Sequence, residues 1–328
     1  MAALASPAGA ERRPIRDTDL LDLVWASDPQ ISPDGSAIAF VRVVADRRRD
    51  AYASSIWIAP VDGGAPRAMT TGTRDTTPRW SADGGRLAFL RPDAGGRQVP
   101  QVFALDLGGG EPAQLTRLAE GVTTFAWAPD GRRLAVSATV GRPSPAAPEP
   151  GRPRPSQARI ITRATFRADG LGFLDGRRRG RVFVVDVDLG AGPGPARPLG
   201  QNRIDDQDPV WSPDGTRVLF TAQTAEEPDH APPKIVLVEA DVATGAIEEL
   251  AAIDGVVSRP APSPDGSRVA FIGASNHRPV RSYNQPDLFV LDRATGRVVN
   301  LTDRYDADVG AGLAGDQRAP RRGCRTNG

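Results

Sequence analysis

The chain has 328 residues, of which 39% are hydrophobic and 25% charged, a composition typical of a globular protein. Its formal net charge is +1, so no overall field attracts nucleic acid or anionic lipid, and we expect neither nucleic acid nor a membrane as a partner. The single cysteine, Cys324, excludes an internal disulfide framework and a cysteine-based zinc site, and no apolar run is long enough for a transmembrane helix.

The N-terminal segment is expected to be a flexible extension over residues 1–18. Residues 1–10 are rich in alanine, but no charged region and no sustained apolar stretch accompany them, so the segment does not resemble a secretory signal. We therefore predict a cytoplasmic protein, and the sequence indicates no cofactor.

A turn motif ending in Asp-Gly recurs five times along the chain, and an apolar triplet begins three residues after each glycine. The turns and their triplets are Ile31–Gly35 with Ile38–Phe40, Trp80–Gly84 with Leu87–Phe89, Trp127–Gly131 with Leu134–Val136, Trp211–Gly215 with Val218–Phe220, and Pro262–Gly266 with Val269–Phe271. The aspartate can bond to nearby backbone N–H groups and the glycine adopts the positive φ that closes a hairpin. The triplet then predicts a buried strand, and the tryptophans are large enough to pack between neighbouring sheets.

Each turn is followed by a second apolar strand and a short final strand. Val102–Asp106 leads to Leu115, and Leu288–Asp292 leads to Leu301, with turn residues such as Ala294–Gly296 between the strands. Four short strands per unit are typical of a β-propeller blade. The sequence thus predicts an all-β fold, a propeller of about five four-stranded blades over residues 19–302.

One interval between turns is longer than the others. The turn aspartates are 49, 47, 84 and 51 residues apart, and the long interval contains Phe166–Gly170, which could start a sixth blade. We favour one blade with a loop inserted near 141–180, because the interval holds only one outer-strand half. The Pro- and Arg-rich segment Gly141–Gln157 is predicted to be an exposed, mobile part of this loop.

The ends of the chain do not predict a closed ring. Propellers commonly close by pairing strands from the two termini, but residues 303–328 are rich in Asp, Gly and Arg and contain no strand pattern. We expect an irregular tail and an incomplete ring. Unpaired strand edges template association, so self-association through open blade edges is a further expectation.

Three stretches resemble a known family. The turn copies resemble repeats of Tol-system periplasmic propellers and of prolyl oligopeptidase family serine peptidases. The segments Asp19–Gly35, Ile161–Gly172 and Leu301–Gln317 are most similar to the acylaminoacyl-peptidase-like branch of the peptidases, in which a short helix leads into the first blade. In that family the propeller precedes an α/β-hydrolase domain and limits the entry of peptides to its active site.

The chain lacks the catalytic part of that plan. No serine has glycine at both the −2 and +2 positions, and Ser275, after Gly273, is followed by Asn276 and His277 rather than by a nucleophile elbow. The resemblance therefore implies a non-catalytic propeller fragment of a serine peptidase, with no catalytic residue in this chain and a peptide substrate only in the full enzyme. The alternative is a free-standing, TolB-like propeller that binds a protein partner.

A few polar groups are weak candidates for binding. In related dipeptidyl peptidases acidic pairs on the propeller bind a substrate amino terminus, so Glu226 and Glu227 are candidate substrate-binding residues. His230 is interpreted as a solvated loop residue. The acidic run from Asp303 to Asp316 has oxygen ligands that suit calcium but lacks the spacing of an EF-hand, so no metal site is predicted.

Overall fold

The computed structural model describes residues 13–94, 98–141, 161, 166–168, 172–173, 179–200, 205–224, 231–232, 234–276 and 284–310. Within them the strands form five four-stranded antiparallel sheets and one two-stranded sheet, and the helical structure is one 3-10 helix, η1 (Asp17–Asp22). The prediction of an all-β propeller with about five four-stranded blades is confirmed. No helix in these ranges is long and apolar enough to cross a membrane.

Each sheet follows the repeat unit in chain order. The first contains β1 (Val24–Ile31), β2 (Ala37–Asp46), β3 (Ala51–Pro60) and β4 (Arg67–Ala68), and the second contains β5 (Thr76–Trp80), β6 (Arg86–Pro92), β7 (Pro100–Asp106) and β8 (Ala113–Gln114). The fourth contains β15 (Asp206–Trp211), β16 (Arg217–Gln223), β17 (Ile235–Asp241) and β18 (Ile247–Ala251), and the fifth contains β19 (Gly255–Pro262), β20 (Arg268–Ser275), β21 (Asp287–Asp292) and β22 (Val298–Asn300).

The third sheet takes its strands from both ends of the 84-residue interval. Its members are β9 (Val122–Trp127), β10 (Arg133–Val140), β13 (Arg179–Asp186) and β14 (Ala196–Pro198). The short strands β11 (Arg167–Ala168) and β12 (Gly172–Phe173) lie between β10 and β13 in the chain and pair with each other. Residues 142–157 of the predicted mobile loop lie outside the described residues.

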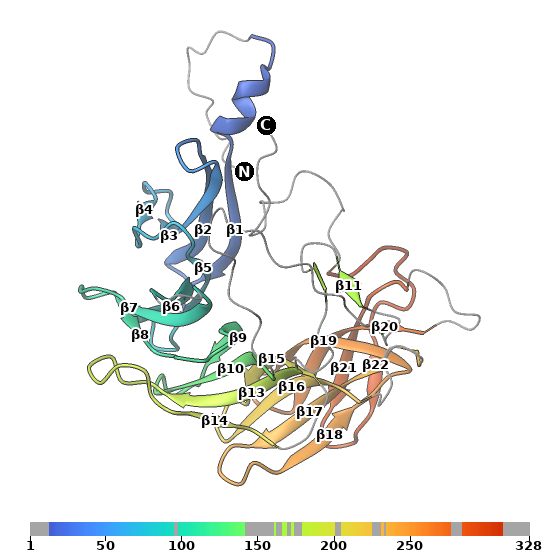
Figure 1. Cartoon of the computed structure of the whole chain (residues 1–328). Coiled ribbons are helices and arrows are strands. Elements are labelled where there is room, and N and C mark those ends of the chain that lie inside the picture. The colour runs from blue at the N-terminus through green and yellow to red at the C-terminus, as the bar shows by residue number, and fades with distance from the viewer. Residues whose placement is uncertain are drawn as a thin grey trace.

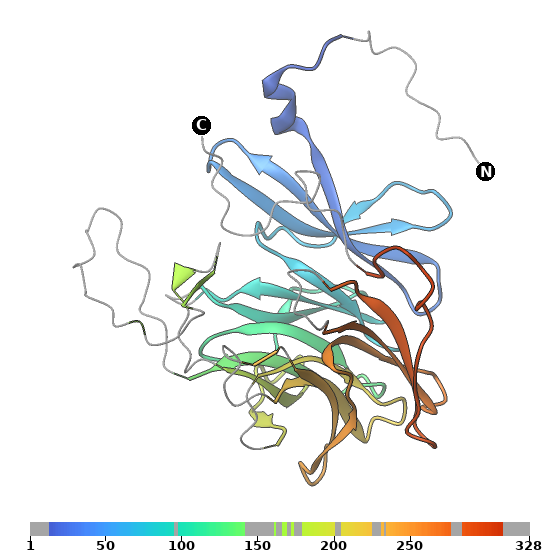
Figure 2. The ribbon, with the colours of Figure 1, turned by 90° about the vertical axis from the view of Figure 1, so that its right-hand side faces the viewer.

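The five sheets follow one another around an arc, shown in Figure 1. The first strand of each sheet lies toward the inside of the arc, and each sheet contacts the next in chain order. Figure 2 shows the arc from the side, with η1 extending from the end of the first sheet. In Figure 1 the first and fifth sheets stand at the two ends of the arc and do not meet.

The core consists of layers between successive sheets. Along β16, Val218 and Phe220 pack toward the third sheet, whereas Leu219 packs toward the fifth, because successive side chains of a strand point to opposite faces. Both faces are thus buried, which explains the continuous apolar triplets. Seven residues of the second to fifth triplets are at most 1% exposed, as the repeat predicts: Leu87, Phe89, Leu134, Val218, Phe220, Val269 and Phe271. In the first triplet, Ile38 and Phe40 are only partly buried.

Candidate functional site

The Asp-Gly turns are held by a repeated hydrogen-bond pattern. The Ser32 hydroxyl donates to Asp34 Oδ1 at 2.6 Å and accepts from the Ala37 backbone N–H at 3.0 Å, and Ser212 and Ser263 make the same contacts in later blades. The hydroxyl contact from Ser263, helped by the Ser267 N–H, lowers the pKa of Asp265 to about 2. These aspartates are therefore ionised turn-holding groups at neutral pH.

Tryptophans at the ends of the innermost strands connect the second, third and fourth sheets to the sheet before each of them. The indole N–H of Trp80 donates to the Gln30 carbonyl at 3.0 Å, that of Trp127 to Arg79 at 3.1 Å, and that of Trp211 to Ala126 at 3.2 Å. Each acceptor is one residue before the tryptophan position of the preceding blade. The predicted packing of tryptophan between sheets thus includes a directional bond that fixes how neighbouring sheets are placed.

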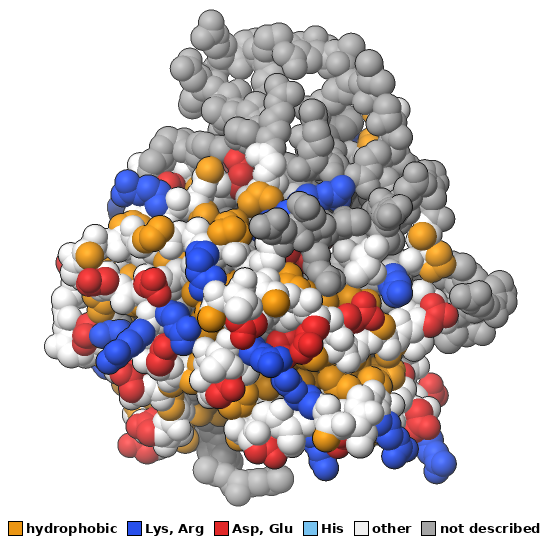
Figure 3. Space-filling model, turned by 90° about the horizontal axis from the view of Figure 1, so that it is seen from below, with side chains coloured by type: hydrophobic (Ala, Val, Ile, Leu, Met, Phe, Trp, Pro, Cys, Tyr) orange, Lys and Arg blue, Asp and Glu red, His pale blue; other side chains and the backbone are white. Residues whose placement is uncertain are grey.

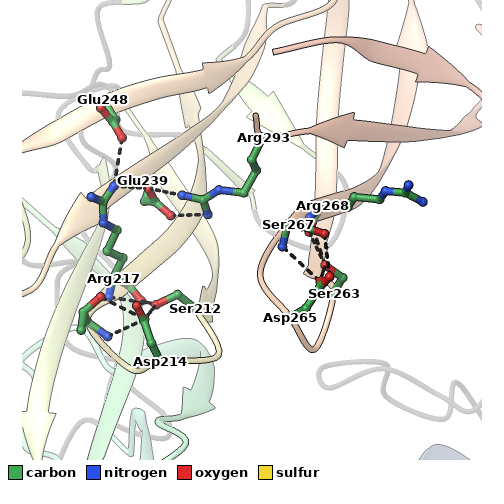
Figure 4. A network of polar contacts seen from close by, with 11 residues as sticks. Ser212, Asp214, Arg217, Glu239, Glu248, Ser263, Asp265, Ser267, Arg268 and Arg293 are labelled. Carbon is green, nitrogen blue, oxygen red and sulfur yellow. Dashed lines mark hydrogen bonds and ion pairs between the residues drawn. The ribbon is translucent and has the colours of Figure 1, made fainter. Parts of the chain in front are cut away.

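A buried carboxylate links the fourth and fifth sheets, as Figure 4 shows. Glu239 of β17 is 1% exposed, and its Oε2 accepts from Arg217 Nη1 at 2.6 Å. Arg293, which follows β21, donates to Oε1 at 2.8 Å and to Oε2 at 2.9 Å. Both carboxylate oxygens are engaged by guanidinium groups, so Glu239 is suited to hold two sheets together and not to act as a free acid or base.

These groups form the floor of a hollow of about 540 Å³ between the two sheets. The Asp-Gly turns of both blades also line it, including Asp214 and Asp265. Figure 3 views the molecule from below and shows acidic and basic side chains interspersed on that face, without a large patch of one sign. Such a mixed surface does not favour binding to a polyanion.

A second hollow, of about 340 Å³, lies at the inside of the arc, where residues of β5, β9, β15 and β19 meet. The indoles of Trp80 and Trp127 line it together with the charged Asp208 and Arg259. Asp208 and Arg259 have φ of 52° and 51°, each directly before a proline and at an irregularity in the pairing of its strand. Asp28 and Thr77, which also precede prolines at register shifts of β1 and β5, have φ of 50° and 59°, so this left-handed residue is a repeated feature of the innermost strands. This hollow is the candidate site for a ligand that enters along the inside of the arc.

Only some of the site residues predicted from the sequence lie among the described residues. Glu226, Glu227, His230 and His277 lie outside the described residues. Ser275 is exposed at the end of β20. The acidic residues Asp303, Asp306 and Asp308 belong to no group of three or more potential metal ligands within the described ranges.

The sequence analysis singled out the turn aspartates and tryptophans that line the two hollows, but it missed other residues that shape them. Glu239 stands where the other blades have Ile58, Ala104, Val184 and Val290, so a lone acid in an otherwise apolar strand could have indicated it. No local signal identifies its partner Arg293, which lies 54 residues further along the chain. Asp208 and Arg259 precede prolines that recur two residues before the first residue of the turn motif, a repeat that could have indicated them.

The repeated sheets and their fastening by tryptophans define a β-propeller. No family model matches the chain. Over 222 residues it is 30% identical to the uncharacterized peptidase YuxL of Bacillus subtilis, a match that covers 67% of this chain and 33% of that protein. The predicted resemblance to peptidases is confirmed, and the chain spans about a third of the length of this relative.

Solved structures of similar fold include β-propellers of peptidases. The acylaminoacyl peptidase of Pyrococcus horikoshii matches with a TM-score of 0.63 and 18% identity, covering 89% of this chain and 41% of its own. The propeller domain of the trilobed protease of Pyrococcus furiosus, described as having an open velcro topology, matches with a TM-score of 0.58 and 17% identity. That match covers 88% of this chain and 73% of the other. The chain is thus similar to the propellers of such peptidases.

Proposed function

We propose that this chain is a non-catalytic propeller of a serine peptidase, and that in the whole enzyme it limits which peptides reach the active site. The observation that carries the proposal is the 30% identity to a peptidase over 222 residues, in a chain whose described residues form a propeller. A peptide substrate is then a partner of the whole enzyme, and the chain itself supplies the access path.

The inside of the arc supports this role. Extended peptides are narrow, whereas a folded domain of 100 residues has a radius of gyration of about 13 Å. A path along the innermost strands would admit extended peptides and exclude folded domains. The indoles of Trp80 and Trp127 offer apolar contact there, and Asp208 and Arg259 offer charges that sense the side chains of a passing peptide.

A chimera tests the proposal. This chain replaces the region that it matches in the Bacillus subtilis relative, and the hydrolysis of a short chromogenic peptide is compared with that of a folded protein. We expect cleavage of the peptide and protection of the folded protein. Equal cleavage of both substrates would contradict an access-limiting role.

Reversing a charge at the second hollow tests whether peptides pass this site. In the chimera, Arg259→Glu changes the local charge by two units, which at about 6 Å in water shifts the interaction with one peptide charge by about 1.4 kcal/mol. The basic peptide gains this energy and the acidic peptide loses it, so the ratio of kcat/KM for the basic over the acidic peptide should rise about 100-fold. Arg297→Glu, at an exposed site between β21 and β22, is the matched control and should leave the ratio unchanged. An unchanged ratio in Arg259→Glu would place the access path elsewhere.

The TolB-like alternative, a free-standing propeller that binds a protein, shares the fold. No contact described above favours it, and an active, size-selective chimera would argue against it.

A further inference from the structure

The innermost strand of the third sheet, β9, lacks a proline that the innermost strands of the other four-stranded sheets share. Phe125 of β9 lies two residues before the last residue of its strand, and the other four strands have a proline at this position: Pro29, Pro78, Pro209 and Pro260. Proline removes a backbone N–H donor, and natural proteins use it to keep sheet edges from pairing. Among these five strands of the described residues, β9 therefore keeps a donor that the others lack.

The pairing of β9 is also more regular. The four strands that contain proline shift register at that proline. In contrast, β9 pairs with β10 without a shift from Thr124 to Trp127. Thr124 does not have left-handed backbone, whereas the residues at its position in the other four strands do: Asp28, Thr77, Asp208 and Arg259. The last four residues of β9 thus form a regular strand edge.

Two residues of β9 direct their backbone groups toward the edge that no strand covers. β9 is the terminal strand of its sheet, on the inside of the arc (Figure 1). The Ala128 N–H donates to the Arg133 carbonyl at 2.9 Å where the β9–β10 hairpin closes. Hydrogen bonding alternates along an antiparallel pair, so Ala126 bonds to β10, whereas the N–H and C=O groups of Phe125 and Trp127 point to the free edge. No hydrogen bond from another described residue reaches these four groups.

This free edge lies at the second hollow. Thr124, Phe125, Ala126 and Trp127 line the hollow of about 340 Å³ in succession. Thr124 Oγ1 is buried there and has no hydrogen-bond partner within the described part of the chain. Buried polar groups are normally hydrogen-bonded. The hollow thus brings together four backbone groups and one hydroxyl that a ligand could satisfy.

We propose that an extended peptide binds in this hollow by pairing with β9 as an additional strand of the third sheet. Alternate residues of a strand are about 6.7 Å apart, so a peptide of about three residues spans the backbone groups of Phe125 and Trp127. Main-chain hydrogen bonds of this kind recognise extended backbone, and side chains contribute only the preference among sequences. A folded domain offers no unpaired extended segment to the edge. The inference rests on the proposed function and identifies which strand of the access path a peptide contacts.

Amide hydrogen exchange of the purified chain, followed by NMR, tests the pairing at single residues. The probe is a capped pentapeptide of threonine and valine, and its control is the same peptide N-methylated at every residue, which has no donor and cannot pair. With the probe at about ten times its Kd, exchange of the Phe125 and Trp127 amides should slow about tenfold. The N-methylated peptide should leave both rates unchanged. The amides of Trp80 and Trp211, which end strands that contain proline, are the matched control and should keep their rates with either peptide.

A variant of β9 gives a second readout. Phe125→Pro introduces the residue that the other four innermost strands have and removes one donor of the edge. Fluorescence anisotropy of a dye-labelled probe peptide should therefore show at least about tenfold weaker binding. Phe125 is 4% exposed and packs in the core between the second and third sheets. Phe125→Leu is the matched control, because it also reduces this packing but keeps the N–H, and it should bind the peptide normally. The exchange measurement on the original chain decides the question if Phe125→Pro does not fold.

Four results would overturn pairing at β9: no binding of the probe peptide, equal binding of the N-methylated peptide, equal protection of the Trp80 and Trp211 amides, or protection of Phe125 that rises with chain concentration without peptide. The last result would identify a second copy of the chain as the occupant of the edge. The chimera separates this inference from the proposed function. A size-selective chimera together with an unprotected Phe125 amide refutes the inference alone, whereas equal cleavage of both substrates by the chimera contradicts the function itself.

Discussion

Removing Arg293 should destabilise the chain strongly, because it leaves Glu239 buried with one partner instead of two. Glu239 is 1% exposed, and Arg293 makes two of its three guanidinium contacts. Breaking a buried ion pair by removing one partner costs about 3–5 kcal/mol. The Arg293 side chain is 25% exposed and Arg217 remains bound to Glu239, so we expect about 3 kcal/mol for Arg293→Ala.

Deleting the carboxylate should cost less than isolating it. Glu239→Val places there an apolar residue like those at the same position in the other blades, and in the double variant the remaining Arg217 can turn toward water. We therefore expect the double variant Arg293→Ala/Glu239→Val to be more stable than Arg293→Ala alone. Urea unfolding measures this, since a slope of about 1–3 kcal/mol/M converts 3 kcal/mol into a midpoint shift of about 1 M or more.

The control for this series is Arg297→Ala, on the same turn as Arg293 but exposed, which should change stability by less than about 0.5 kcal/mol. The reasoning is refuted if Arg293→Ala matches that control, or if the double variant is no more stable than Arg293→Ala.

Two further predictions concern the blade turns and the tryptophans. Trp211→Phe keeps most of the packing but removes the N–H donor to the Ala126 carbonyl. It should therefore lower the free energy of unfolding in urea by about 1–2 kcal/mol. A loss below about 0.3 kcal/mol would show that this hydrogen bond between sheets is unimportant. The pKa of Asp265 lies at about 2, below its ordinary value near 4, so its ionisation stabilises the fold above pH ~4 and the contribution is lost as the pH falls through 2. Ser263→Ala should raise that pKa toward the ordinary value in an NMR titration of the carboxyl carbon, and an unmoved pKa would mean that the hydroxyl contact is not its cause.

The blade cores were predictable because a local signal specifies them. The turn glycine fixes where the next strand begins, and strand periodicity then places Phe89, Phe220 and Phe271 at equivalent buried positions. The tryptophan position could be assigned to the region between sheets for the same reason. Its hydrogen-bond acceptor could not, because the Arg79 carbonyl lies 48 residues from Trp127 and is brought near only by the stacking of sheets.

The backbone conformation at the second hollow was not predictable from local propensity. A residue before proline favours extended backbone, yet Asp208 and Arg259 adopt left-handed backbone where the pairing of β15 and β19 shifts its register. The tertiary packing of buried Pro209 and Pro260 accompanies this conformation. The partners of Glu239 depend likewise on how two sheets stack, which one sequence does not encode locally.

Labelling of the purified chain by a fluorophosphonate probe tests most directly the proposal that the chain is non-catalytic. Acyl transfer by a serine peptidase needs an activated serine, a histidine base, an orienting acid and oxyanion donors. No serine of the sequence lies in the Gly-x-Ser-x-Gly pattern of a nucleophile elbow. We predict no labelling and no hydrolysis of acyl-peptide or aminoacyl chromogenic substrates. Stoichiometric labelling of a serine that is lost on substituting His230 or His277 would contradict the account.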